Sequence, residues 1–488
     1  MLSPRLQLFH DTKLEELTLQ QAREYMDRGL ISAKDLVLLY MHRIATFDKG
    51  PNGLHSILEI NPDALQTAEA LDQERKETGY RSALHGVPVL VKDNLATADK
   101  MHTSAGSIAL KDSYATKDSF VVKQLREAGA IILGKTNMTE WANFMSDEMP
   151  SGYSSRGGQV MNPYGSSFDC GGSSSGSGAS VAANFAMLAI GTETSGSILS
   201  PASQNSLVGV KPTVGLISRS GIVPISTTQD TAGPMARTVV DAALTMNSLT
   251  AFDPLDPITN TNILRDTDFT SNLDTNGLEG AKVGIVREGI FKYMTDEQLP
   301  IVEQAIAQLR DMGAHIVDEV TIPSMQASWT MDVMTYEFKV ALNAHLKDYH
   351  SISAPKMLAE IIEFNRRNPD ERLKYGQSIL EQSEQTSGTL TDAAYLNALT
   401  FDQYKAKEEG IDAVLQEHQL DALVFPNNFG ASIPAKAGYP SVTVPAGYTS
   451  AGEPVGITFT GSAFSESTLL KYAYAFEQAT KQRKKPQL

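Results

Sequence analysis

The chain of 488 residues contains a single cysteine, Cys170, which limits the covalent cross-links that could hold it together. One thiol cannot form an intramolecular disulfide, a zinc ribbon or an iron–sulfur cluster. Stability must therefore come from a packed core, and a reducing, cytoplasmic setting suits the composition. The H-E-x-x-H pattern of metal-dependent hydrolases is also missing, so the sequence gives no support to metal hydrolysis.

Positive charge and long hydrophobic runs are scarce as well. Lys and Arg number 41 against 57 Asp and Glu, a formal net charge of −16. Such acidity disfavours nucleic acid and anionic membrane surfaces as partners. The longest small and apolar run, residues 180–190, is shorter than the ~20 residues that span a bilayer, and the N-terminus lacks a signal-peptide core. We therefore expect a soluble cytoplasmic protein.

Short apolar segments alternate with amphipathic ones along most of the chain. Residues 85–92 form a β-type run, 120–127 have helical spacing and 130–133 again favour a strand. The same alternation resumes after a polar connector at residues 253–280. This pattern is typical of an α/β fold. We predict one large domain with a twisted, mostly parallel central sheet that is covered by helices on both faces.

The predicted domain covers residues 1–488. Its expected parts are a helical N-terminal region (1–80), a catalytic core (81–245), a helical substrate-pocket region (about 325–418), and closing strands with a helix (420–480).

Residues Gly129–Thr136 (GAIILGKT) match the P-loop pattern letter for letter. In a P-loop the four variable residues form a loop whose amides bind phosphate. Here those residues are Ala-Ile-Ile-Leu, which favour a strand. We prefer to interpret the segment as a junction between a helix and a strand, and we keep a nucleotide-binding protein as an alternative of another class.

Two segments rich in glycine and serine lie close together in the predicted core. Gly171–Ser180 leads into the apolar run 180–190, which we expect to be a buried helix, and Gly191–Ile198 follows it. Small residues allow backbones to approach closely and leave hydroxyls beside free amides. Acyl-transfer chemistry requires such a nucleophile next to an oxyanion hole.

A serine nucleophile needs a base, and histidine is the usual one. None of the nine histidines lies in a recognisable base context. Lys92 ends the apolar run 85–92. Burial disfavours the charged ammonium and lowers the pKa of a lysine, and the neutral amine can accept a proton. The alternative is a surface lysine whose stem packs on the protein.

Taken together, these segments resemble the amidase signature family. The similarity covers most of the chain, strongly over residues 15–245 and moderately over 420–480. The matching blocks are Leu84–Asn94, Gly134–Glu140, Gly171–Ser177, Gly191–Ile198, Pro201–Ser203, Val208–Gly215, Ser218–Pro224, Gln229–Arg237 and Gly438–Pro445.

The resemblance implies a Ser–cis-Ser–Lys triad and no metal or organic cofactor. By motif match, Ser197 is the nucleophile, Ser173 the bridging serine after a cis Gly172–Ser173 bond, and Lys92 the base. The implied oxyanion hole consists of Thr194, Ser195 and Gly196. The implied supporting residues are Ser175 and Thr192.

The resemblance is closest to the peptide amidase branch, which removes ammonia from C-terminally amidated peptides. Ser151–Tyr164 and Gly221–Pro234 carry this similarity. The alternative is the glutamine-hydrolysing component of a tRNA-dependent amidotransferase, its A subunit. That protein has an arginine where this chain has Leu199. We expect a small-molecule or short-peptide amide as substrate, and the sequence leaves a monomer and a homodimer open.

Overall fold

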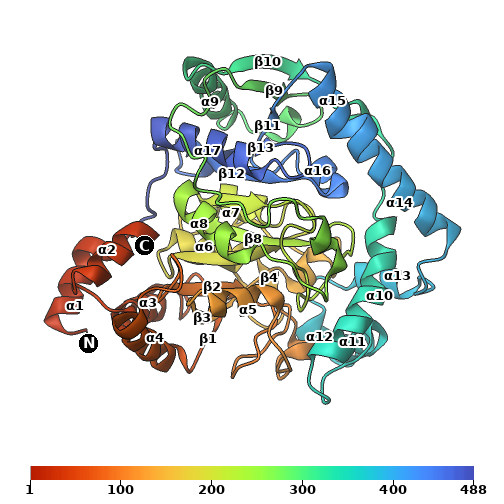
Figure 1. Ribbon diagram of the computed structural model, residues 1–488. Coiled ribbons are helices and arrows are strands. Elements are labelled where there is room, and N and C mark those ends of the chain that lie inside the picture. Colours follow the sequence, from red (N-terminus) through yellow and green to blue (C-terminus); the bar gives the residue numbers. More distant parts are fainter. Residues whose placement is uncertain (1) are drawn as a thin grey trace.

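One eleven-stranded sheet runs through the computed structural model, which describes residues 2–488 (Figure 1). The strand order is β1-β3-β2-β6-β8-β7-β12-β13-β11-β9-β10. The strands are β1 (Ile57–Ile60), β2 (Pro88–Lys92), β3 (Ile131–Thr136), β6 (Leu188–Glu193), β7 (Val208–Lys211), β8 (Thr231–Ala236), β9 (Lys282–Val286), β10 (His315–Val320), β11 (Ala422–Pro426), β12 (Ser441–Tyr448) and β13 (Pro454–Thr460), with a separate hairpin of β4 (Tyr153–Ser154) and β5 (Gly158–Gln159).

The sheet is mixed in direction. Its parallel pairs are β2–β3, β2–β6, β9–β11 and β9–β10, and the pairs between β6 and β11 in the centre are antiparallel. Parallel neighbours need a long crossover, whereas β12 and β13 are joined by a short turn. The predicted α/β class and helical cover are confirmed. The edge pair β1–β3 is antiparallel as well, so the sheet is mixed, with its parallel pairing within β3–β2–β6 and β11–β9–β10.

Helices cover both faces of this sheet. The α-helices are α1 (Pro4–Phe9), α2 (Leu19–Asp27), α3 (Ala33–Phe47), α4 (Ala64–Thr78), α5 (Phe120–Glu127), α6 (Ser175–Ala182), α7 (Leu199–Gln204), α8 (Val239–Leu249), α9 (Leu299–Asp311), α10 (Asp332–Tyr349), α11 (Leu358–Arg366), α12 (Pro369–Arg372), α13 (Ser378–Glu384), α14 (Ala393–Ala406), α15 (Asp412–Glu417), α16 (Ser432–Ala437) and α17 (Glu466–Thr480). The packed faces of α1–α9 and α17 form one large apolar core with the inner strands, whereas α10, α11 and α13 pack in a separate apolar cluster.

The chain reverses its direction across the sheet at β2. The crossover from β2 through α5 leads outward to β3, and the crossover from β3 through α6 returns past β2 to β6. Because such crossovers are right-handed, α5 and α6 must lie on opposite faces. A crevice forms at the carboxyl ends of strands where the connections diverge in this way. Lys92 ends β2 and Glu193 ends β6, so the fold places the predicted site in this crevice.

Two local expectations are wrong. The first 80 residues are not entirely helical, because Ile57–Ile60 forms the edge strand β1. The apolar run 180–190 is not one helix, since α6 ends at Ala182 and β6 begins at Leu188. A short, fully buried apolar run has no periodicity that separates helix from strand.

Residues 129–136 form the predicted junction between a helix and a strand, which contradicts the P-loop alternative. Ile131–Thr136 is the buried strand β3, and Lys135 is completely buried. Its Nζ donates to Oγ1 of Thr103 at 3.0 Å and to the carbonyl of Leu95, so it does not face a phosphate-binding loop.

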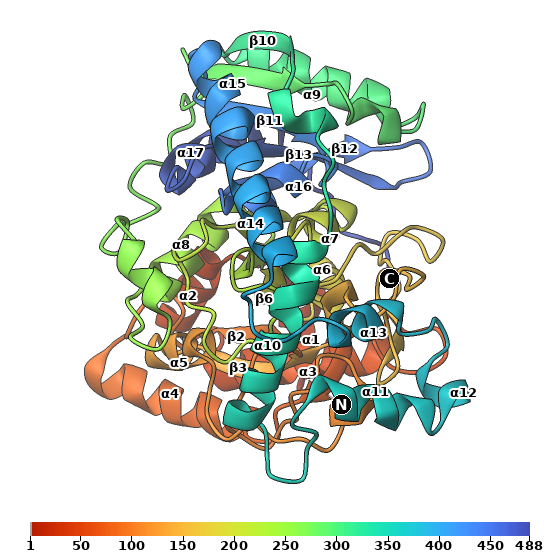
Figure 2. The ribbon, with the colours of Figure 1, turned by 90° about the vertical axis from the view of Figure 1, so that its right-hand side faces the viewer.

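Helices α10 to α15 lie along one side of the molecule. They are on the right in Figure 1, and Figure 2 shows α10 and α14 passing in front of the strands. The connector at 253–280 does not divide the sheet, because β7, which precedes it, pairs with β12, which follows it. Among residues 2–488, none of the helices combines the length and apolar character needed to cross a membrane.

Candidate active site

Lys92 lies at the carboxyl end of β2 and is completely buried. Its Nζ donates to Oγ of Ser173 at 2.8 Å, to Oγ1 of Thr192 at 3.0 Å and to the carbonyl of Thr192 at 3.3 Å. Burial lowers the pKa of Lys92 to about 7, against the opposing attraction of Glu193 and Asp230. Near pH 7 the neutral amine is therefore accessible, as a general base requires.

Ser173 follows a cis peptide bond to Gly172 and is completely buried. Two residues later α6 begins, and the small side chains of this helix let it pack closely under the strands. The hydroxyl of Ser174 donates to the carbonyl of Thr192 at 3.0 Å. The segment is thereby tied to the end of β6, which holds Ser173 against Lys92.

The carboxylate of Glu193 organises the turn that carries Ser197. It accepts hydrogen bonds from the backbone amides of Gly196 at 2.8 Å, Ile198 at 2.7 Å and Leu199 at 3.0 Å. Glu193 itself is buried. One acid therefore satisfies the amides that would otherwise be unpaired where the strand turns into α7.

Ser197 lies at this turn with 8% of its surface exposed. Its carbonyl accepts a hydrogen bond from the amide of Ser174 at 3.2 Å, so the two serine segments are in contact. Within residues 2–488 the hydroxyls of Ser173 and Ser197 do not hydrogen-bond to each other. Catalytic hydrogen bonds are often long before substrate binds and shorten in the complex.

The amides near the nucleophile differ in their availability. The amide of Gly196 is engaged by Glu193. Within the described residues, the amides of Thr194, Ser195 and Ser197 make no hydrogen bond, and Ser195 is exposed. The free amides therefore differ from the expected oxyanion-hole residues. The Glu193 carboxylate binds the Gly196 amide, and the Ser197 amide is free instead.

The two predicted supporting residues lie in different places. Thr192 contacts Lys92 directly, and its Oγ1 also accepts from Nδ2 of Asn94 at 2.9 Å. Ser175 donates to the carbonyl of Gly171 at 2.5 Å and contacts neither Lys92 nor the Ser197 hydroxyl. Ser175 therefore shapes the glycine-rich loop.

Sequence reasoning missed a second layer of polar residues. Asp230 is half-buried and accepts from Oγ1 of Thr194 at 2.5 Å and from the amides of Ile225 and Ser226 at 2.8 and 3.0 Å. Burial raises the pKa of Asp230 to about 6. Asp230 lies in the matching block Gln229–Arg237. The spacing of motif residues does not show which backbone amides a carboxylate in that block will bind.

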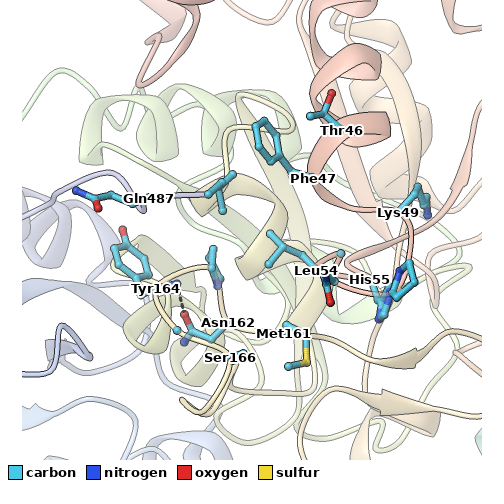
Figure 3. A pocket seen from close by; sticks show the side chains of 16 residues that line it. Thr46, Phe47, Lys49, Leu54, His55, Met161, Asn162, Tyr164, Ser166 and Gln487 are labelled. Carbon is cyan, nitrogen blue, oxygen red and sulfur yellow. Dashed lines mark hydrogen bonds between the residues drawn. The ribbon is translucent and has the colours of Figure 1, made fainter.

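Two cavities differ in their relation to this site. A cavity of about 10 Å³, enough for about one water molecule, touches Asn94, Thr192, Thr194 and Asp230 beside Lys92. A larger one of about 750 Å³ contains none of the predicted site residues (Figure 3). Phe47, Leu54, His55, Met161 and Tyr164 are among the side chains that line it.

Known proteins resemble this chain over almost its whole length. Residues 35–470 match the amidase family. A probable amidase from Arabidopsis thaliana is 42% identical over 498 residues, which is 99% of this chain and 93% of the relative. The structure of peptide amidase from Stenotrophomonas maltophilia has 43% identity and a TM-score of 0.92, covering 97% of this chain and 99% of that one. The A subunit of glutamyl-tRNA(Gln) amidotransferase from Moorella thermoacetica is 32% identical over 496 residues, 98% of this chain and 99% of the relative.

The fold, the buried lysine–serine pair and these matches define the class of the protein as an amide hydrolase. The chain belongs to the amidase family, as its sequence blocks predicted.

Proposed function

We propose that the chain hydrolyses carboxamides through an acyl-enzyme formed on Ser197. The contact between Nζ of Lys92 and Oγ of Ser173, 2.8 Å long in a fully buried site, is the observation that carries this proposal. Burial holds much of the lysine neutral near pH 7. A neutral amine already bonded to a hydroxyl can draw a proton through it from a neighbouring nucleophile.

The proposed reaction has two halves. As Ser197 attacks the amide carbonyl, its proton passes to Ser173, whose own proton passes to Lys92. The free amides of Thr194, Ser195 and Ser197 stabilise the oxyanion. The same relay then protonates the leaving nitrogen, and the C–N bond breaks. Water attacks the resulting ester, the relay accepts its proton, and Ser197 is regenerated with the carboxylic acid.

We propose C-terminal peptide amides as the substrates. Support comes from the similarity to the Stenotrophomonas maltophilia peptide amidase, which extends over nearly all of both chains. A panel of amides tests it, with amidated dipeptides, glutamine, aryl acylamides and fatty amides assayed for release of ammonia or amine. We expect the highest kcat/KM for amidated dipeptides. Turnover of aryl or fatty amides with amidated dipeptides left intact would contradict the substrate assignment.

A second candidate is the glutamine-hydrolysing component of a tRNA-dependent amidotransferase. The 32% identity to the A subunit from Moorella thermoacetica favours it. Against it, Leu199 is completely buried at the start of α7, whereas the A subunit is expected to have an arginine at this position. Glutaminase activity that appears only with a partner protein would support this candidate, and turnover of amidated dipeptides by the isolated chain would oppose it.

A further inference from the structure

The loop between β11 and α16 covers the turn that carries the nucleophile. Gly196 has a φ of 83°, in the left-handed region that glycine tolerates best. A Cβ atom at Gly196 would lie 3.2 Å from Nδ2 of Asn428 and 3.8 Å from Cβ of Ala431. Asn428 therefore borders the residue that precedes Ser197, although more than 200 positions separate them in the sequence.

The backbone of this loop is firmly held. The side-chain oxygen of Asn427 accepts from the amide of Gly456 at 2.8 Å, and the amide of Asn427 donates to the carbonyl of Gly456 at 2.8 Å. The carbonyl of Asn428 accepts from the amide of Ala431 at 3.0 Å. These bonds join the loop to β13 and begin the turn into α16, so the position of Asn428 is fixed before any ligand arrives.

The side-chain carboxamide of Asn428 lacks a partner among the described residues. The residue is half-buried, and within residues 2–488 its carboxamide makes no hydrogen bond. A carboxamide offers two N–H donors and an acceptor oxygen and carries no charge. A peptide group offers one donor and one acceptor in a matching plane. A simple acyl amide has only its scissile carboxamide, which the nucleophile and the oxyanion amides engage.

We propose that Asn428 is a specificity-determining residue that pairs with the peptide group next to the scissile amide of the substrate. This role rests on the proposed function, and it explains how one neutral side chain favours amidated peptides over other carboxamides. A site that hydrogen-bonds a substrate amide loses affinity for analogues without it, because its own polar atoms then lack partners.

Two matched substrates test this role. N-acetyl-phenylalanine amide carries a peptide group beside the scissile amide, and 3-phenylpropanamide is the same acid amide without it. We expect Asn428→Ala to lower kcat/KM about tenfold for the first, mainly through KM, and by less than twofold for the second. Asn428→Asp should show the same selective loss. Asn272→Ala, in the exposed connector, is the matched control and should change neither value.

Other results would overturn the proposal. An equal loss of kcat on both substrates would place Asn428 at the reacting carbonyl, and unchanged kinetics on both would remove it from the site. Labelling of Ser197 by a fluorophosphonate should proceed at the wild-type rate in Asn428→Ala, because that probe has no peptide group. Failure of the wild-type protein to hydrolyse either amide would refute the proposed function itself, together with this role.

Discussion

Lys92, Lys135 and Lys211 show that burial alone does not make a lysine a catalytic base. All three are buried, and burial lowers the pKa of Lys92 to about 7 and those of Lys135 and Lys211 to about 8. Lys211 donates to the carbonyl of Tyr439, and Lys135 to Leu95 and Thr103. Only Lys92, of these three, contacts a serine hydroxyl beside a turn with free amides. Geometry therefore selects the base from among chemically similar residues.

The pH dependence of kcat/KM should report this base. Because the neutral amine is the active form, kcat/KM should rise about tenfold per pH unit below pH 7 and level off above it. Lys92→Ala should lose a factor on the order of 10³ or more. Lys135→Met should keep the midpoint near 7 even if it is less stable. A profile without this inflection in the wild-type enzyme would remove Lys92 from the role of base.

Glu193 should matter for turnover although it never touches the substrate. In Glu193→Ala, three buried amides lose their acceptor, and each unpaired group costs about 1–3 kcal/mol. We expect kcat to fall at least tenfold with little change in KM, because the turn that carries Ser197 loses its geometry. Glu193→Gln keeps one acceptor oxygen, so its kcat should lie between those of the wild type and Glu193→Ala. Wild-type kcat in Glu193→Ala would show that the turn holds without the carboxylate.

At the scale of elements, local signals predicted some boundaries and missed others. Phe120–Glu127 was predicted to the residue, because its apolar positions recur at helical spacing and Ser119 caps its first turn. Thr231–Ala236 gave no strand signal, since its sequence TAGPMA contains glycine and proline, and it is a strand through pairing with β6 and β7. The division of 180–190 between α6 and β6 likewise depends on tertiary neighbours.

The same limit applies to the site. The motif match named Lys92, Ser173 and Thr192, and the structure brings these three together. No pattern showed that the Glu193 carboxylate would engage the amide of Gly196, or that Asn428 would lie over it. Such contacts join segments distant in sequence or depend on the reach of a single side chain, so they emerge only when the chain is folded.

Helix α6 should tolerate almost no added volume. A Cβ atom at Gly176 would lie 2.3 Å from the carbonyl oxygens of Asn137 and Ser56. Backbone atoms cannot move aside like a flexible side chain, so Gly176→Ala should cost about 3 kcal/mol of unfolding free energy and most of the activity. Chemical denaturation measures the first and amide turnover the second.

Gly452 is the control for that substitution, because its Cβ would meet open space at a φ of 90°. Gly452→Ala should cost only the strain of about 1–2 kcal/mol and keep full activity. Equal stability of the two variants would contradict the close packing of α6.

At the scale of the whole molecule, the C-terminal segment ties the N-terminal region to the catalytic core. Arg483 donates to the carboxylate of Glu16 at 2.7 and 2.9 Å and to the carbonyl of Ser206 at 2.6 Å. It also reaches the carbonyl of Ala182, at the end of α6, at 3.3 Å. One guanidinium thus joins three parts of the chain that are far apart in sequence.

Removing this guanidinium should destabilise the fold in a pH-dependent way. Although burial acts in the opposite direction, Arg483 lowers the pKa of Glu16 to about 2. The ion pair therefore contributes fully above the unfolded-state pKa near 4.5 and is lost as the pH falls towards 2. Arg483→Met should cost about 2 kcal/mol at pH 7, less than a fully buried pair would, because Glu16 is 35% exposed.

Thermal unfolding of wild type and Arg483→Met measures this effect. The difference in Tm should narrow between pH 5 and pH 3. A difference that stays constant over this range would show that the contribution of Arg483 comes from its carbonyl contacts and not from Glu16.

The most direct test of the whole account is covalent labelling of the nucleophile. The intact protein is treated with a fluorophosphonate at pH 8, and the adduct is counted by mass spectrometry and located by peptide mapping. We predict one adduct per chain on Ser197 in the wild type, no adduct in Ser197→Ala, and strongly slowed labelling in Lys92→Ala. Undiminished labelling of Ser197→Ala, or an adduct mapped to another residue, would contradict the assignment of Ser197 as the nucleophile.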